Sequence, residues 1–469
     1  YESLAHHFAA AGERRPTIHY LLRAAERARR VFAHDAALEC YGRLLDLLTH
    51  PEDRPLRCDV LRDRAEVLGW IGDREAQGHA LEEMLSLART LADDVRLARA
   101  LHLRSEWHRI QGMYQPANED AREALRIHRR LGDDHARARL LGQLGRNRLY
   151  VGECDQAEAY FQEALPILKA TGDLKGQIEC LMGQAYIAQY RGNLSTALSF
   201  CRRSLALAEE TGDRQMLSYT LSAVGLGYID LGDMDGAEPY LQRALQVAEA
   251  SGEKRLQAVT HVRLAHISLN REDLETARAR LWAGLQMLRE VRDAPWEAYT
   301  LSVLGEVELL QGRYQVAREY LEAAYRLHLD LGEHDNAAVS LSYLAVAELA
   351  MGEEDLAWKH SQQVMRKAEA EWPGTECCPE VPYNCFLVAE GTHRWAAARA
   401  ALEKAARVVV ERTARIGDLT SQEKYRTGLR VHRAIAEALA QQPPPVSYTH
   451  LRAHETRHEL VCRLLLEKK

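Results

Sequence analysis

The residues in this sequence with the clearest chemical pattern are His454, Glu455 and His458, which form the motif H-E-x-x-H. On a helix the two histidines would share one face and bind zinc, with the glutamate as general base. No third histidine follows at the spacing of zinc proteases, and the run Gln441–Pro445 ends the helical pattern just before the motif. The motif therefore has no scaffold, and we predict no zinc site there.

The tail that carries this motif resembles the translation of a sequencing adapter. The string Val446–Thr456 is similar to the in-frame translation of a transposon-end adapter, and residues 460–469 are similar to the matching flow-cell primer running into poly-A. Residues 457–459 fall where a variable index would lie. We predict that residues 442–469 are a non-native tail with no part in fold or function.

A second group with metal-ligand chemistry is Cys377, Cys378, Cys385 and His393. Adjacent cysteines rarely fit a tetrahedral site, and the usual short spacing between paired cysteines is missing. The surrounding prolines indicate an irregular turn, so we interpret these thiols as incidental and predict neither a metal nor another cofactor. The sequence has no phosphate-binding G-x-x-x-x-G-K-[ST] loop and no recognisable catalytic set, so we expect no enzyme.

Composition and charge restrict the class of protein. Hydrophobic residues make up 46% and charged residues 28%, which is typical of a folded chain. The net charge of −7 provides no global basic field for nucleic acid, so a nucleic-acid partner is not expected. No apolar run approaches the ~20 residues of a membrane helix. The nine cysteines are scattered, which indicates reduced thiols and a cytoplasmic location.

A repeat of forty residues organises most of the chain. One glycine column consists of Gly72, Gly112, Gly152, Gly192, Gly232, Gly312 and Gly352, with Glu272 in the missing place. A second column consists of Gly132, Gly172, Gly212, Gly252 and Gly332. A column of small residues consists of Ser105, Gly145, Ala185, Gly225, Ala265, Gly305 and Ala345. Each glycine column predicts the left-handed residue that ends a helix, and the small column predicts close helix packing.

One repeat unit illustrates the predicted helix pair. Apolar residues at helical spacing predict a first helix over residues 137–151 and a second over residues 155–170. Asp173, directly after Gly172, is expected to cap the next helix by accepting from its free N–H groups. A single pair cannot bury its apolar face, so the pairs must stack.

These columns resemble tetratricopeptide repeats, whose usual period is about 34 residues. The resemblance implies an all-α fold, a right-handed α-solenoid of helix pairs with the longer period of 40 residues seen here. We predict irregular opening repeats over residues 1–50, regular repeats over residues 51–370 and atypical closing helices over residues 371–441. The fold alone implies a binding module and not a particular partner.

Both ends of the repeats resemble a family of large bacterial ATP-dependent signalling and transcription regulators. The matching segments are residues 4–48 and residues 397–440, the latter with Glu411–Asp418. In that family an ATPase module precedes the repeats, and some members add a nucleotide cyclase or a LuxR-type helix-turn-helix. The resemblance implies a non-catalytic sensor or interaction part, with an ATPase domain upstream in a longer protein. A free-standing scaffold that assembles other proteins is the alternative.

The first helix of each tetratricopeptide repeat lines the binding groove, so the resemblance also implies candidate groove residues. These are Arg62, Glu66, Trp70, Arg99, His102, Glu106, Arg109, Arg139, Arg146, Tyr150, Met182, Tyr186, Gln189, Tyr190, Tyr219, Ser222 and Asp230, with His266, Tyr299, Ser302 and Glu306 further along. Arginine clamps beside tyrosine platforms suit acidic peptides or peptides with a C-terminal carboxylate. We therefore expect a protein or peptide partner in this groove.

Overall fold

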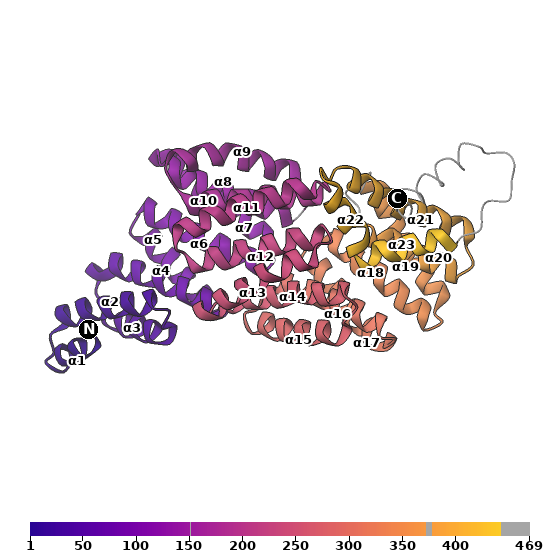
Figure 1. The fold of residues 1–469 in the computed structure, drawn as a ribbon. Coiled ribbons are helices and arrows are strands. Elements are labelled where there is room, and N and C mark those ends of the chain that lie inside the picture. The colour runs from indigo at the N-terminus through magenta and orange to yellow at the C-terminus, as the bar shows by residue number, and fades with distance from the viewer. Residues whose placement is uncertain (151, 372–377, 442–469) are drawn as a thin grey trace. The chain divides into compact units, whose positions relative to one another are not determined.

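The computed structural model describes residues 1–150, 152–371 and 378–441, with the side chains of Tyr150, Glu369 and Glu371 outside the description. Every regular element in these ranges is a helix, as Figure 1 shows. No helix in the same ranges is both long and apolar enough to cross a membrane. The all-α prediction is confirmed.

Nine helix pairs follow one another on the forty-residue register. The first helices of the pairs are α2 (Arg14–Arg30), α4 (Arg54–Ile71), α6 (Asp94–Ile110), α8 (Asp134–Tyr150), α10 (Leu174–Tyr190), α12 (Arg214–Asp230), α14 (Lys254–Asn270), α16 (Ala294–Leu310) and α18 (His334–Ala350). The second helices are α3 (His34–Leu47), α5 (Arg74–Thr90), α7 (Tyr114–Leu131), α9 (Cys154–Ala170), α11 (Leu194–Thr211), α13 (Met234–Ser251), α15 (Leu274–Glu290), α17 (Tyr314–Asp330) and α19 (Glu354–Glu371).

The remaining helices lie at the two ends of this series, except for one short 3-10 helix, η1 (Pro51–Asp53), between α3 and α4. The helices at the ends are α1 (Glu2–Ala10), α20 (Glu380–Gly391), α21 (Trp395–Ala414), α22 (Leu419–Gly428) and α23 (Arg430–Gln441). The pair α2 and α3 begins on the same register as the later pairs, although residues 1–50 read as irregular in sequence.

The predicted turn chemistry is confirmed. Gly172 has a φ of 69°, and the Asp173 carboxylate accepts from the backbone N–H of Gly176 at 2.9 Å. Glu272, which replaces glycine in the first column, adopts a φ of 64° all the same. The turn geometry is therefore set by the repeat, because even a residue with a side chain is held in the left-handed region.

The column of small residues is where the two helices of a pair approach each other. A Cβ atom on Gly145 would lie 2.7 Å from the Phe161 ring, and one on Gly225 would lie 2.5 Å from Cγ of Leu241. Both distances are below van der Waals contact, so a larger side chain would force the helices apart.

The row of first helices is called the inner layer here, and the row of second helices the outer layer. In α16 buried residues occur on all sides of the helix, including Thr300, Ser302 and Glu308. In α17 only Ala317, Leu321, Ala324 and His328 are buried, so the opposite face is solvated. In this pair the first helix is therefore buried on more sides than the second.

The chain divides into two compact units. Unit 1 comprises residues 1–180, 246–258 and 286–294, and unit 2 comprises residues 181–245, 259–285 and 295 onward. Inside unit 1, Arg74 Nε donates to the carbonyl oxygen of Val291 at 3.2 Å, so residues 286–294 pack on the turn between α4 and α5. Unit 2 contains the four closing helices.

Candidate partner-binding surfaces

In unit 1 the inner layer carries an ionic ladder, defined here as Glu106, Arg109, Arg146 and Glu179. Arg146 Nη1 pairs with the Glu179 carboxylate at 2.6 Å, and Arg146 Nη2 lies 3.5 Å from the Glu106 carboxylate. Arg109 pairs with the same Glu106. These residues come from α6, α8 and α10, so successive first helices are linked in order.

The neighbouring charges keep Glu106 of the ladder ionised at neutral pH. Burial raises the pKa of Glu106, but the guanidinium groups of Arg109 and Arg146 outweigh it and lower this pKa well below its usual range. Burial, with a contribution from Arg139, lowers the pKa of His102 to about 4, so this imidazole is neutral at pH 7. Charged guanidinium groups therefore lie beside a neutral histidine.

The arginines of unit 1 predicted from sequence do not all join the ladder. Arg139 lies 3.6 Å from Asp173 and contributes to the electrostatics of His102. Arg62 pairs with Asp63 at 2.7 Å instead. Arg99 is exposed on α6. The groove residues expected from the sequence include Glu106 but neither Glu179 nor Asp173.

One donor of the ladder, the Nε of Arg146, is buried and makes no hydrogen bond within the described residues. A buried donor without a partner is costly, and a carboxylate oxygen would satisfy it. Because Glu106 and Glu179 already fix the guanidinium, such a carboxylate would meet a preorganised group.

In unit 2 the tyrosine-rich part of the predicted groove is only partly exposed. Tyr186 is 47% exposed, whereas Gln189 donates to the carboxylate of Asp230 at 2.7 Å. The hydroxyl of Tyr190 donates to Asp335 at 3.4 Å. Tyr219 is half-buried, and the side chain of Tyr150 lies outside the described residues.

Further along unit 2 lies an inner cluster, defined here as Asp230, Arg263, His266, Tyr299 and Glu306. Tyr299 Oη and His266 Nε2 share a hydrogen bond of 2.9 Å. The Arg263 guanidinium donates to Ser222 Oγ at 2.8 Å and lies over the Trp296 ring at 5.6 Å. Burial raises the pKa of Asp230 to about 7, against the opposing effect of Arg263.

Two contributions to this cluster were missed in the sequence. Arg263 occupies the repeat position that holds Ala223 one repeat earlier and Gly183 two repeats earlier. A charged residue at a position that otherwise holds small residues was the signal in the sequence that could have indicated Arg263. Arg430 of α23 pairs with Glu306. The repeat pattern could not indicate Arg430, because the closing helices do not follow the forty-residue spacing.

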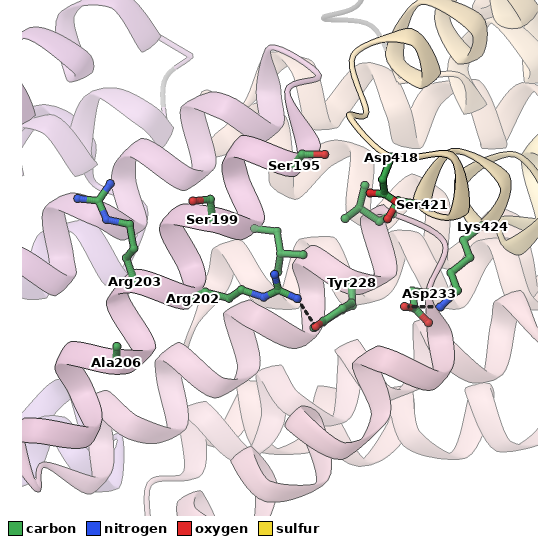
Figure 2. Close-up of a pocket in the computed structure, with 12 residues that line it drawn as sticks. Ser195, Ser199, Arg202, Arg203, Ala206, Tyr228, Asp233, Asp418, Ser421 and Lys424 are labelled. Atoms are coloured by element: carbon green, nitrogen blue, oxygen red, sulfur yellow. Dashed lines mark hydrogen bonds and ion pairs between the residues drawn. The ribbon is translucent and has the colours of Figure 1, made fainter.

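A cavity of about 550 Å³ lies in unit 2 between α11, the end of α12 and α22. Figure 2 shows Arg202 reaching Tyr228 and Lys424 reaching Asp233 along its wall. The wall is completed by Ser195, Leu198, Ser199, Arg203, Ala206, Leu231, Asp418 and Ser421. This cavity was not predicted, because one of its walls comes from a closing helix.

The described part of the chain contains no cluster of side chains that could bind a metal ion. No three His, Cys, Asp or Glu side chains group as metal ligands over residues 1–150, 152–371 and 378–441. Burial raises the pKa of Cys385 to about 11, which keeps this thiol protonated. Cys377, the motif His454–His458 and the predicted tail 442–469 lie outside the described residues.

Family comparisons match the repeats. The model of the MalT-like TPR region matches residues 98–290. A tetratricopeptide-repeat model matches residues 256–330 and 296–370. A search for related sequences among curated proteins finds no match.

Solved structures of helical repeat proteins are similar at low identity. A Rap protein complexed with competence and sporulation factor is 17% identical, with 72% of this chain and 99% of that chain covered and a TM-score of 0.48. A Signal Transduction ATPase with Numerous Domains from Pyrococcus horikoshii, with a tetratricopeptide repeat sensor, is 16% identical. That comparison covers 71% of this chain and 53% of the other, with a TM-score of 0.42.

A third solved structure is aspartyl phosphate phosphatase F from Bacillus subtilis, at 13% identity and a TM-score of 0.44. The match covers 78% of this chain and 95% of the phosphatase chain. The helix pairs and the matches to the two repeat families establish the fold. Residues 98–370 of this chain are tetratricopeptide repeats, and residues 98–290 resemble the MalT-like repeat region.

Proposed function

We propose that this chain is a non-catalytic module that binds a protein or peptide through the ionic ladder of unit 1. The observation that carries the proposal is the geometry of Arg146, whose guanidinium is held by two carboxylates and keeps one buried donor without a partner. Inner layers of stacked repeats provide extended surfaces for partners. Arginine in a fixed orientation recognises carboxylates through charge-assisted hydrogen bonds.

The partner chemistry that suits this ladder is an acidic segment or a free C-terminal carboxylate. Arg109, Arg139 and Arg146 come from adjacent first helices, so a partner lying across α6 and α8 meets all three. Glu106, Glu179 and Asp173 balance these cations, so selectivity rests on hydrogen-bond geometry more than on net charge.

The wider setting that we propose is a cytoplasmic, multidomain, ATP-dependent signalling or transcription regulator, with these repeats as its sensor. The match of residues 98–290 to the MalT-like repeat region supports this setting. A free-standing scaffold is the alternative. The gene upstream of Tyr1 distinguishes them, since an ATPase module there supports the regulator and a nearby start codon supports the scaffold.

The binding surface can be tested with immobilised peptides that carry Asp or Glu residues and a free C-terminus. We expect the full chain to enrich such peptides and the variant R109A/R139A/R146A to lose at least tenfold in affinity. The matched control is R122A/R126A/R129A, which removes three exposed arginines from the outer face of α7. Equal enrichment by all three proteins would reject the ladder as the binding surface.

A further inference from the structure

Residues 415–433, here called the strap, run over the ends of successive first helices in unit 2. Arg415 Nη1 donates to the carbonyl oxygen of Arg191, directly after α10, at 2.7 Å. Lys424 Nζ pairs at 2.7 Å with Asp233, which lies just beyond α12. The first two contacts are thus made at the same place in neighbouring repeats.

The second half of the strap continues this pattern on the next repeats. Arg433 donates to the carbonyl of Asn270, the last residue of α14, at 3.1 Å and pairs with Glu272 at 2.7 Å. Arg430 pairs with Glu306 in α16. The strap therefore follows one edge of unit 2, here called the docking edge and defined as residues 191, 232–233, 270–272 and Glu306.

The chemistry of the docking edge selects a basic segment. Each side chain that the strap contributes to these contacts is a cation, whereas the edge contributes carboxylates and carbonyl oxygens. Helix C-termini carry partial negative charge and carbonyls without intrahelical partners. Three of them in a row give a repeated array of acceptors for Arg and Lys.

One aromatic ring anchors the strap. Tyr425 is 1% exposed, and its backbone lies against the docking edge, since a Cβ atom on Gly232 would be 3.1 Å from Tyr425 Cα. Its ring packs edge-on against His432 of the strap itself, at 4.5 Å between centroids. It is the one buried residue of α22. A segment that binds this edge thus combines basic residues with an aromatic side chain.

The other residues of α22 are exposed or only partly buried, so this central part of the strap is exchangeable. Leu419 is 78% exposed, and Ser421 and Lys424 of α22 line the cavity of about 550 Å³ (Figure 2). Apart from Tyr425, the buried contacts of the strap lie at its two ends, at Ile416 and at Val431 and His432. Between them α22 is held by the Lys424 ion pair, the Tyr425 ring and the contact of Gly428 with Gly232, and it opens more readily than a helix with a packed apolar face.

We propose that the docking edge is a binding surface for a basic, aromatic-bearing protein segment, and that the strap occupies it in cis until such a segment displaces it. This site is separate from the ionic ladder and does not depend on the function proposed above. A tethered segment competes at an effective concentration on the order of millimolar, so foreign segments bind well only when the strap is released.

The backbone offers a precise way to release the strap. A Cβ atom on Gly428 would overlap the backbone of Gly232, whereas one on Gly417 would meet nothing. Neither glycine has a left-handed φ, so alanine fits the local backbone at both positions. Gly428→Ala therefore blocks docking, and Gly417→Ala is its matched control in the same segment.

The probe is a fluorescein-labelled peptide of residues 415–433, added to the full chain and followed by anisotropy. We expect G428A to bind the peptide at least tenfold more tightly than the wild type, and G417A to behave as the wild type. A peptide with Tyr425→Ala should bind G428A at least tenfold more weakly. Equal capture by G428A and G417A, or equal binding of a scrambled peptide, would overturn the proposal.

A second experiment uses charge-reversal variants, so that the proposal can still be tested if G428A disturbs the closing helices. In K424E/R433E we expect hydrogen exchange to speed up at least tenfold in residues 419–428, while α12 and α14 keep their protection. Adding Glu272→Arg should restore part of that protection by re-forming one pair with reversed charges. Unchanged exchange in K424E/R433E, or no recovery on adding Glu272→Arg, would overturn the proposal.

Discussion

Asp230 shows how burial and charge compete at a single residue. Burial raises the pKa of its carboxyl to about 7, although Arg263 and Arg412 lower it and Gln189 donates to it. Folding thus places this group where its proton is held more tightly than in the unfolded chain. A carboxyl with a raised pKa stabilises the fold at low pH and loses that contribution as pH rises.

The Asp230 carboxyl therefore makes stability depend on pH in a defined window. Its contribution is complete below the ordinary pKa of 3.8 and is lost as pH rises through about 7. We expect Asp230→Asn to match the wild type near pH 4 and to exceed it at pH 8 by about 1–3 kcal/mol, because the amide carries no charge to bury. Urea unfolding at both pH values measures this, and equal differences at the two pH values would contradict it.

At the scale of helices, the closest approach within each pair is set by the small column. Gly305 has no room for a Cβ atom, which would overlap Leu321 of the second helix. Gly42 also lies inside a helix, α3, but a Cβ atom there would meet nothing within 4 Å. The two glycines therefore differ in packing and share the same helical backbone.

This difference predicts opposite effects of one chemical change. Gly305→Ala should destabilise the protein by about 1–3 kcal/mol through overpacking. Gly42→Ala should stabilise it by about 0.5–1 kcal/mol, because alanine loses less backbone entropy in a helix. Thermal unfolding of both variants tests the assignment, and a stabilised Gly305→Ala protein would show that the helices can separate at no cost.

At the scale of the whole molecule, contacts between distant repeats hold unit 1 together. A Cβ atom on Gly72 would overlap the side chain of Val291, more than two hundred residues later in the chain. Arg74, 3% exposed, donates to the Val291 carbonyl in the same contact. Stacking of neighbours alone does not produce this contact, so unit 1 is more than a row of adjacent pairs.

A pair of glycine variants isolates the energy of that distant contact. Gly72 and Gly132 both have a left-handed φ, but a Cβ atom on Gly132 would meet nothing. We expect Gly132→Ala to cost about 1 kcal/mol from backbone strain alone. Gly72→Ala should cost about 2–4 kcal/mol, because overpacking is added to the same strain. Unfolding in guanidinium chloride measures the difference in free energy of unfolding. Equal losses of stability in the two variants would mean that residues 286–294 can move away from Gly72 at no energetic cost.

The sequence by itself determined the repeat, the helix pairs and their turns. These follow from local rules, such as Gly172 ending one helix and Asp173 capping the next. It also determined that Arg109 and Arg146 lie in the inner layer, since the register places both in first helices. The binding role of these residues stays a prediction.

Only the tertiary structure decided which charges meet. The pairing of Arg430 with Glu306, the contact of Gly72 with Val291 and the course of the strap along unit 2 join residues that share no periodic signal. A forty-residue register fixes neighbours in adjacent repeats, because their spacing is constant. It cannot fix contacts made by the closing helices or across several repeats, since those depend on how small rotations add up along the stack.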